Sequence, residues 1–206
     1  MRAWVLEFGA PRTVGWVEVE VAPPGPGRAL VRTLCSGISS GTEMLAYRGE
    51  IAPDTPLDES LGSLGGTFAW PFRYGYSCVG VVEAGDAPEG ERVFTFHPHQ
   101  TCFVQDASQL VSLGDLDPRA ATLFPLVETA LQVTLDAGAV AEELVVVSGL
   151  GAIGLLAGAL LRRAGARVIA SEPRPFRRAL AARWGLDAVP PEELENEVMD
   201  ASGGRG

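Results

Sequence analysis

Six residues, Gly149-Leu150-Gly151-Ala152-Ile153-Gly154, carry the most specific chemical pattern of the chain, the spacing G-x-G-x-x-G. They follow the apolar run 144–147 and open an Ala- and Leu-rich segment, the strand–turn–helix context in which this spacing is informative. The first glycine allows a tight turn, the second lets a pyrophosphate approach the backbone, and the third lets helix and strand pack closely. Free N–H groups at the start of the helix attract phosphate. The pattern therefore predicts a dinucleotide-binding loop.

Glu172 strengthens this prediction because it follows the next expected strand, residues 167–170, where an acid can reach the ribose hydroxyls of the cofactor. A carboxylate there repels a 2′-phosphate, which favours NAD over NADP. Arg174 is the nearest of three arginines, with Arg177 and Arg178, that keep NADP open by offering partners to that phosphate. The competing interpretation is a solvated strand end beside a solvated helix face.

His97 and His99, in the segment His97-Pro98-His99, are the only histidines. Histidine titrates near neutrality and suits proton transfer. The segment follows an expected strand over residues 92–96. We expect at least one of the two to be functional, with His99 ahead of His97; the alternative is a turn cap and an exposed ring.

The arrangement of elements predicts two domains. Up to about residue 113, short apolar runs alternate with turn signals, as in a β-rich domain. A Pro-, Gly-, Asp- and Ser-rich stretch, residues 49–66, is expected to be a long loop, which often has a function. From residue 118, strand and helix alternate at the spacing of a parallel α/β unit, with a break in the first helix at Pro125. We place the domains at residues 1–117 and 118–206.

Composition limits the partners. The formal net charge is -10, and no basic stripe offsets it, which argues against nucleic acid. All sixteen basic residues are arginine, which excludes a Schiff-base lysine. Residues 144–161 carry no charge, but the glycine turn inside them favours strand and helix over a membrane span. Three scattered cysteines fit a reducing compartment, and the N-terminus has no leader-like pattern, so we expect a cytoplasmic protein. We expect its partner to be a small-molecule substrate.

Several segments together resemble the medium-chain dehydrogenase/reductase superfamily. They are Ser36-Gly-Ile-Ser-Ser-Gly-Thr-Glu43 with Tyr47-Arg-Gly49, Tyr74-Gly-Tyr-Ser-Cys-Val-Gly-Val-Val-Glu-Ala-Gly85, Gly90-Glu-Arg-Val93 and Glu128-Thr-Ala-Leu131. They follow the family order and cover almost the whole chain. The resemblance implies an α/β protein with a GroES-like β-barrel catalytic domain at residues 1–117 and a partial Rossmann domain at residues 118–206.

The chain departs from the family at its catalytic zinc. Ser39 or Ser40 stands at the first ligand position, Tyr76 and Ser77 stand at the histidine and the adjacent acid, and the later ligand falls near Pro125. These residues do not make an ordinary zinc site. The four-cysteine structural lobe is also missing, and the spacing of the remaining cysteines and histidines brings no three together. We expect no metal.

Without zinc, hydrogen-bond donors and a proton relay must act on the substrate oxygen. The resemblance places Ser40, Thr42 and Tyr76 there, with Thr42 matching a relay hydroxyl, and Thr129 near the nicotinamide. Ordinary turn and strand packing is an equal alternative for Ser40 and Thr42.

The expected reaction is NAD(P)-dependent oxidation of an alcohol or reduction of a carbonyl, with Tyr76 or His99 as acid/base. A likeness to bacteriochlorophyllide hydroxyethyl dehydrogenases favours it. Reduction of an enone or quinone, a non-catalytic nicotinamide sensor and a decayed fragment stay open. The family continues beyond the point where this chain ends, so we expect a truncated enzyme. Unpaired sheet edges would then favour association, and a homodimer is left open.

Overall fold

The computed structural model describes residues 1–58 and 64–205, and the chain forms two compact units, Met1–Phe124 and Pro125–Gly206. The boundary between the units follows Phe124, whereas the domain boundary expected from the sequence follows residue 117. The middle of the expected loop at residues 49–66, residues 59–63, lies outside the described residues. None of the helices in the described ranges combines the length and the apolar content that crossing a bilayer requires.

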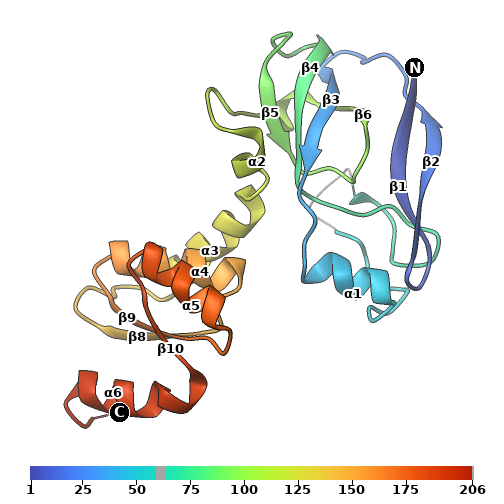
Figure 1. The fold of residues 1–206 in the computed structure, drawn as a ribbon. Coiled ribbons are helices and arrows are strands. Elements are labelled where there is room, and N and C mark those ends of the chain that lie inside the picture. Colours follow the sequence, from blue (N-terminus) through green and yellow to red (C-terminus); the bar gives the residue numbers. More distant parts are fainter. Residues whose placement is uncertain (59–63, 206) are drawn as a thin grey trace. The chain divides into compact units, whose positions relative to one another are not determined.

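The first unit is mainly antiparallel β-structure (Figure 1). Its elements are β1 (Arg2–Ala10), β2 (Thr13–Glu20), β3 (Arg28–Ser36), α1 (Thr42–Arg48), β4 (Cys78–Gly85), β5 (Arg92–Thr95), β6 (Cys102–Asp106), the 3-10 turn η2 (Ala107–Gln109), β7 (Val111–Ser112) and α2 (Pro118–Ala121). β1 and β2 form a hairpin, and the other strands form a sheet in the order β6-β3-β4-β5-β7.

The core of the first unit lies between these two sheets and under the loops that join them. Alternate residues of β1, such as Ala3 and Val5, are buried, while Trp4 between them is exposed, because successive strand residues point to opposite faces. β1 is also tied to two loops: Leu6 N donates to the carbonyl of His99, and Phe8 N donates to the carbonyl of Phe72. The histidine segment is therefore anchored to the hairpin through its backbone.

The second unit alternates helices with parallel strands. After α3 (Phe124–Asp136), whose first residue belongs to the first unit, it contains β8 (Leu144–Ser148), α4 (Ala152–Arg163), β9 (Arg167–Ser171), α5 (Pro175–Arg183), β10 (Asp187–Val189), η3 (Pro191–Glu193) and α6 (Leu194–Ser202). The strands pair in the order β10-β9-β8, all parallel. In Figure 1, α4 and α5 lie on one side of this sheet and α6 on the other.

One local expectation changes, and one exposed helix face is unusual. Pro125 does not break the helix that contains it but lies in the first turn of α3, where a missing N–H costs no hydrogen bond. The face of α5 that carries Phe176, Leu180 and Trp184 is exposed, and Ala181 faces the core instead.

Candidate functional site

The glycine loop joins β8 to α4 as the sequence predicts. Gly149 has a φ of 91°, and its N–H donates to the carbonyl of Ser171 at the end of β9 (2.7 Å). A Cβ atom at Gly154 would overlap the carbonyl oxygen of Gly149, so close approach of helix and loop requires glycine there. A Cβ atom at Gly151 would meet nothing within 4 Å, so protein packing does not explain this glycine. The open space beside Gly151 fits a ligand that approaches the backbone.

The start of α4 offers hydrogen-bond donors. Gly151 is its N-cap and provides no side-chain acceptor. The amides of Ala152 and Ile153, in the first turn, lack partners within the helix, as all first-turn amides do. Both residues are exposed. This terminus can therefore bind a phosphate through its N–H groups and the partial positive charge of the helix dipole.

The Glu172 carboxylate binds backbone amides of the glycine loop and of the turn after β9. The side chain is buried, Oε2 accepts from Leu150 N (2.9 Å), and Oε1 accepts from Arg174 N (3.0 Å). The Arg174 backbone N–H is the main reason that the pKa of Glu172 is lowered, with Leu150 and Arg177 adding to it. Glu172 thus holds the glycine loop against the end of β9. Its expected contact with ribose hydroxyls stays a prediction.

The three arginines after β9 differ in what they bind. Arg178 donates to the carbonyl oxygens of Glu172 (2.7 Å) and Pro173 (2.9 Å), and Arg177 pairs with the Glu172 carboxylate (3.4 Å). Arg174 is exposed, and its guanidinium has no ion pair within residues 1–58 and 64–205. Arg174 is therefore the arginine best placed to accept a phosphate.

His99 lies at the centre of a buried polar cluster in the first unit. Its Nε2 is 2.7 Å from Glu43 Oε2, and its Nδ1 is 2.8 Å from Ser36 Oγ. The side chains of His99 and Glu43 are only 4% and 3% exposed. Sequence reasoning selected His99 but missed Ser36 and Glu43, because no spacing rule connects residues so far apart in the chain.

His97 has a different environment. Its ring stacks on Phe103 (3.7 Å between centroids), and Nδ1 lies 2.9 Å from the carbonyl oxygen of Pro98. Burial lowers the pKa of His97 to about 4. It borders a hollow of about 530 Å³ that Arg73 and Glu7 also line. The lowered pKa makes His97 a weak base, so its surroundings favour packing on Phe103, and its catalytic role stays a prediction.

The remaining candidates are spread over both units. Ser40 and Thr42 are exposed at the start of α1, and Tyr76 is half-buried, in edge-to-face contact with Tyr74 (6.0 Å). Burial is the main cause that raises the pKa of Tyr74 to about 12. In the second unit, Thr129 is exposed on α3 and donates to the carbonyl of Pro125 (2.9 Å).

No family model matches the chain. Among characterised proteins, it is 29% identical to L-threonine 3-dehydrogenase of Pyrococcus furiosus, over 92% of this chain and 62% of that protein. It is 34% identical to 2-desacetyl-2-hydroxyethyl bacteriochlorophyllide A dehydrogenase of Cereibacter sphaeroides, over 50% of this chain and 30% of that protein. The chain therefore spans less than two thirds of the length of these relatives.

Solved structures share its fold. The 2R,3R-butanediol dehydrogenase of Bacillus subtilis superposes with a TM-score of 0.79 at 20% identity, over 98% of this chain and 67% of that chain. The quinone oxidoreductase of Thermus thermophilus, also solved in complex with NADPH, gives 0.74 at 22% identity, over 97% and 62%. The chain is therefore similar in sequence to these dehydrogenases and shares the fold of these solved structures. The expected fold class, a GroES-like domain with a partial Rossmann domain, is confirmed.

The family that the sequence resembles binds a catalytic zinc at positions that fall on Ser39 or Ser40, Tyr76, Ser77 and Pro125 here, and these residues do not fit one. Ser77 Oγ donates to the carbonyl of Thr122 (2.7 Å), Tyr76 offers a phenol, and Pro125 has no ligand atom. Both oxygens of nearby Glu43 already accept hydrogen bonds, from Ser39 N and from His99. Within the described ranges, no three His, Cys, Asp or Glu residues gather closely enough to hold a metal.

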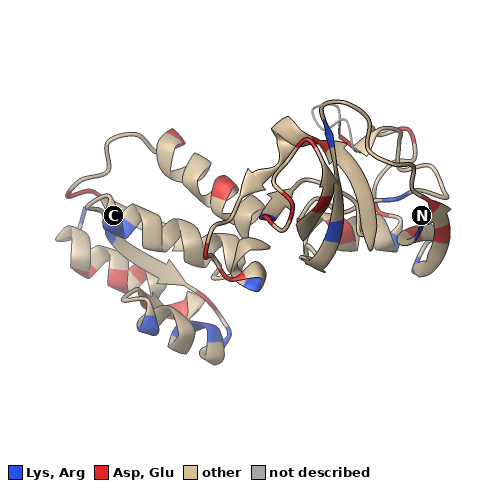
Figure 2. Cartoon of the chain, turned by 90° about the horizontal axis from the view of Figure 1, so that it is seen from above, with Lys and Arg blue, Asp and Glu red and all other residues tan. Residues whose placement is uncertain are grey.

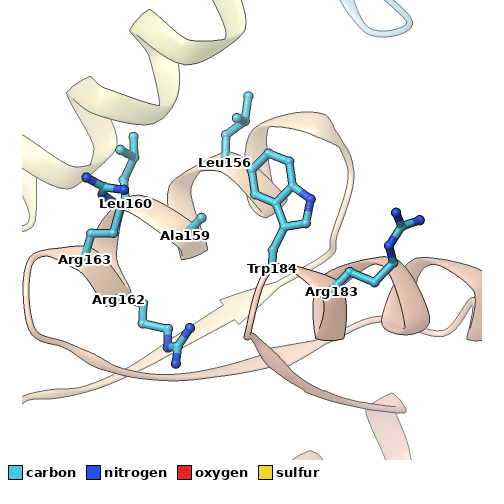
Figure 3. Close-up of a pocket in the computed structure, with 7 residues that line it drawn as sticks. All are labelled: Leu156, Ala159, Leu160, Arg162, Arg163, Arg183 and Trp184. Carbon is cyan, nitrogen blue, oxygen red and sulfur yellow. The ribbon is translucent and has the colours of Figure 1, made fainter.

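A hollow of about 900 Å³ lies on the second unit, along α4 and beside Trp184 (Figure 3). Leucine and alanine form its floor, and three arginines, Arg162, Arg163 and Arg183, stand around it. It contains no residue of the glycine loop and no acid.

Proposed function

We propose that the protein is an NAD(P)-dependent oxidoreductase that transfers hydride between nicotinamide and an alcohol or carbonyl substrate without a catalytic zinc. One observation carries the cofactor assignment: a glycine loop, held by buried Glu172, opens an uncapped helix in the second unit. The two relatives described above are dehydrogenases, and the quinone oxidoreductase that shares the fold has been solved in complex with NADPH. The bound nicotinamide would supply or accept the hydride.

The residues of the loop have separable roles in this proposal. The amides of Ala152 and Ile153 and the open face of Gly151 bind the pyrophosphate. Glu172 positions the loop and, as an anion, favours NAD, whereas exposed Arg174 favours NADP. We propose NAD as the preferred cofactor because the Glu172 carboxylate is held at the loop itself, while Arg174 lies after β9 on an exposed turn.

Polar side chains of the first unit replace the electrophile that zinc would provide. Tyr76, Ser40 and Thr42 offer hydroxyl donors, and His99 offers a ring that can carry a proton. We place the protein in the cytoplasm because Cys35, Cys78 and Cys102 are all free thiols. We expect a small-molecule substrate, because the acidic residues that are coloured red along both units in Figure 2 and the net charge of -10 disfavour nucleic acid.

Reduction of a quinone or enone is a second candidate, because an activated alkene needs less electrophilic help than a plain ketone. The proposed site offers the hydroxyl groups of Ser40, Thr42 and Tyr76, and the fold is shared with a quinone oxidoreductase; both observations favour this reaction. The two reactions separate in a substrate screen with 2R,3R-butanediol, L-threonine and benzoquinone as probes.

Titration with NADH and NADPH, followed by nicotinamide fluorescence, tests the cofactor assignment. We expect saturable binding with NADH preferred, and Glu172→Gln should shift the preference toward NADPH. Arg174→Ala should weaken NADPH binding on the order of tenfold, as for a lost charge-assisted contact. Arg163→Ala, on the last turn of α4, is the control and should change neither affinity.

Each other outcome has a meaning. Wild-type preference for NADPH would contradict the role given to Glu172. Absence of binding to either nucleotide would contradict the oxidoreductase proposal for this chain. Binding without hydride transfer to any probe would favour a nicotinamide sensor.

A further inference from the structure

Ser36, His99 and Glu43 form a continuous chain of hydrogen bonds in the first unit. Ser36 is the last residue of β3, Glu43 lies in the first turn of α1, and His99 lies in the segment between β5 and β6. The bonds measure 2.8 Å from Ser36 Oγ to His99 Nδ1 and 2.7 Å from His99 Nε2 to Glu43 Oε2. A hydroxyl, an imidazole and a carboxylate in this order can move a proton.

The position of the imidazole is fixed on several sides. Glu43 Oε1 accepts from Ser39 N (2.9 Å), which aims its other oxygen at His99. The carbonyl of His99 accepts from Leu6 N (2.8 Å) on β1. The ring also lies against Gly75, where an added Cβ atom would stand only 2.8 Å from ring atoms. Because Gly75 has a φ of 127°, both conformation and contact require glycine beside this ring.

In a neutral His99 ring, the two hydrogen-bond partners decide which nitrogen carries the proton. A carboxylate only accepts, so His99 Nε2 must donate to Glu43. In the neutral ring Nδ1 is then an acceptor, so the Ser36 hydroxyl must donate to it. This polarises Ser36 and leaves its oxygen lone pairs for a further donor.

Ser36 lies beside the segment that replaces the metal-binding histidine of the superfamily. Its backbone pairs with Cys78 across β3 and β4, and the following residue, Gly37, donates to the carbonyl of Ser77 (2.9 Å). Tyr76 precedes Ser77 and is half-buried. Ser36 is only partly buried, whereas His99 is buried, so a substrate hydroxyl can reach Ser36 more readily than His99.

We propose that Ser36 is the hydroxyl that exchanges a proton with the substrate oxygen, through a relay completed by His99 and Glu43. The inference rests on the proposed function. In alcohol oxidation the substrate O–H bond breaks and its proton goes to Ser36 Oγ, while the Ser36 proton goes to His99 Nδ1. A bound nicotinamide would accept the C–H electron pair with its hydrogen as hydride, which would leave the carbonyl product. Glu43 is a positioning residue that stabilises the resulting imidazolium, and carbonyl reduction runs the same steps backwards.

Nitrogen-15 NMR of the two histidine rings tests the direction of the hydrogen bonds, with His97→Gln giving the assignment. We expect His99 as the neutral Nε2–H form. Ser36→Ala should shift the His99 Nδ1 resonance, whereas Ser112→Ala, on an exposed strand of the same unit, should leave it unchanged. An Nδ1–H form of His99 would overturn the relay, because Ser36 would then accept rather than donate.

Turnover tests the chemical role, with 2R,3R-butanediol, L-threonine and benzoquinone as the substrates used. Ser36→Ala should lower kcat at least on the order of tenfold, as expected for a lost general acid–base group. Its NADH affinity should not change, Ser36→Thr should recover most of the activity, and Ser112→Ala should match the wild type. A Ser36→Ala variant with wild-type kcat overturns the relay alone. A wild-type protein that transfers no hydride to any probe overturns the proposed function, and the relay with it.

Discussion

The two histidines show how burial separates residues that the sequence treats alike. His97 is stacked on Phe103, and burial lowers its pKa from 6.5 to about 4, so the folded state favours the neutral ring. Above about pH 6.5 the His97 ring is neutral in both the folded and the unfolded state, so protonation of His97 costs no stability there. As the pH falls from about 6.5 to about 4, the free energy of unfolding decreases, because His97 binds a proton in the unfolded state and not in the folded state.

His97→Phe should remove this loss, because phenylalanine keeps the stacking and cannot be protonated. The difference in unfolding free energy between about pH 7.5 and about pH 4.5 should be about 2–3 kcal/mol smaller than in the wild type. Urea unfolding at both pH values measures it. The carboxylates are identical in the two proteins, so equal acid sensitivity would contradict the assignment.

At the scale of single residues, the sequence indicates which residues are suited to chemistry better than it indicates which side chains they contact. His99 could be selected as a proton carrier because histidine is rare in this chain and titrates near neutrality. Ser36 and Glu43 could not, because strand pairing and a turn of helix bring them to His99. Ser40 and Thr42 match family positions, yet both side chains are exposed, and their roles stay predictions.

At the scale of the element, replacing Gly154 or Gly151 of the same loop with alanine should change stability by different amounts. Gly154→Ala places a Cβ atom against the Gly149 carbonyl, so backbone must move, and we expect a loss of more than about 2 kcal/mol. Gly151→Ala meets no atom within 4 Å and has a φ of -69°, so stability should change by less than about 0.5 kcal/mol.

Cofactor binding should show the opposite order of effects. The methyl group of Gly151→Ala occupies the space proposed for the pyrophosphate, so NADH affinity should fall although the fold is intact. Thermal unfolding and NADH titration of the two variants measure the contrast. Unchanged NADH affinity in Gly151→Ala would remove the reason given for glycine there.

The strands and helices of the second unit were largely predictable, because an apolar strand, a glycine turn and an Ala- and Leu-rich helix follow one another without interruption. α1 and α6 were not foreseen. α1 is short and follows a Ser- and Gly-rich turn, and α6 is rich in acidic residues, so neither has a strong apolar period.

For the whole molecule, charge and exposed apolar surface act against each other. The net charge of -10 keeps copies apart at low ionic strength. The second unit nevertheless exposes Val127, Leu131 and Leu135 at spacing four along α3. Trp184 adds apolar surface beside α5 (Figure 3). Apolar stripes of this kind favour association with another surface.

We therefore expect the 206-residue chain to self-associate in a way that depends on both concentration and salt. Raising the ionic strength screens the repulsion over about 10 Å or less, so sedimentation should show larger species in high salt. Leu131→Glu should weaken association by placing a charge in the α3 stripe, whereas Leu116→Glu, at an exposed position of the first unit, adds the same charge and serves as the control. If both substitutions act equally, net charge alone governs association; if only Leu131→Glu acts, the α3 stripe is the contact surface. A monomer at every concentration and salt level would contradict the prediction, because it would mean that the exposed stripe is too small to overcome the repulsion even when that repulsion is screened.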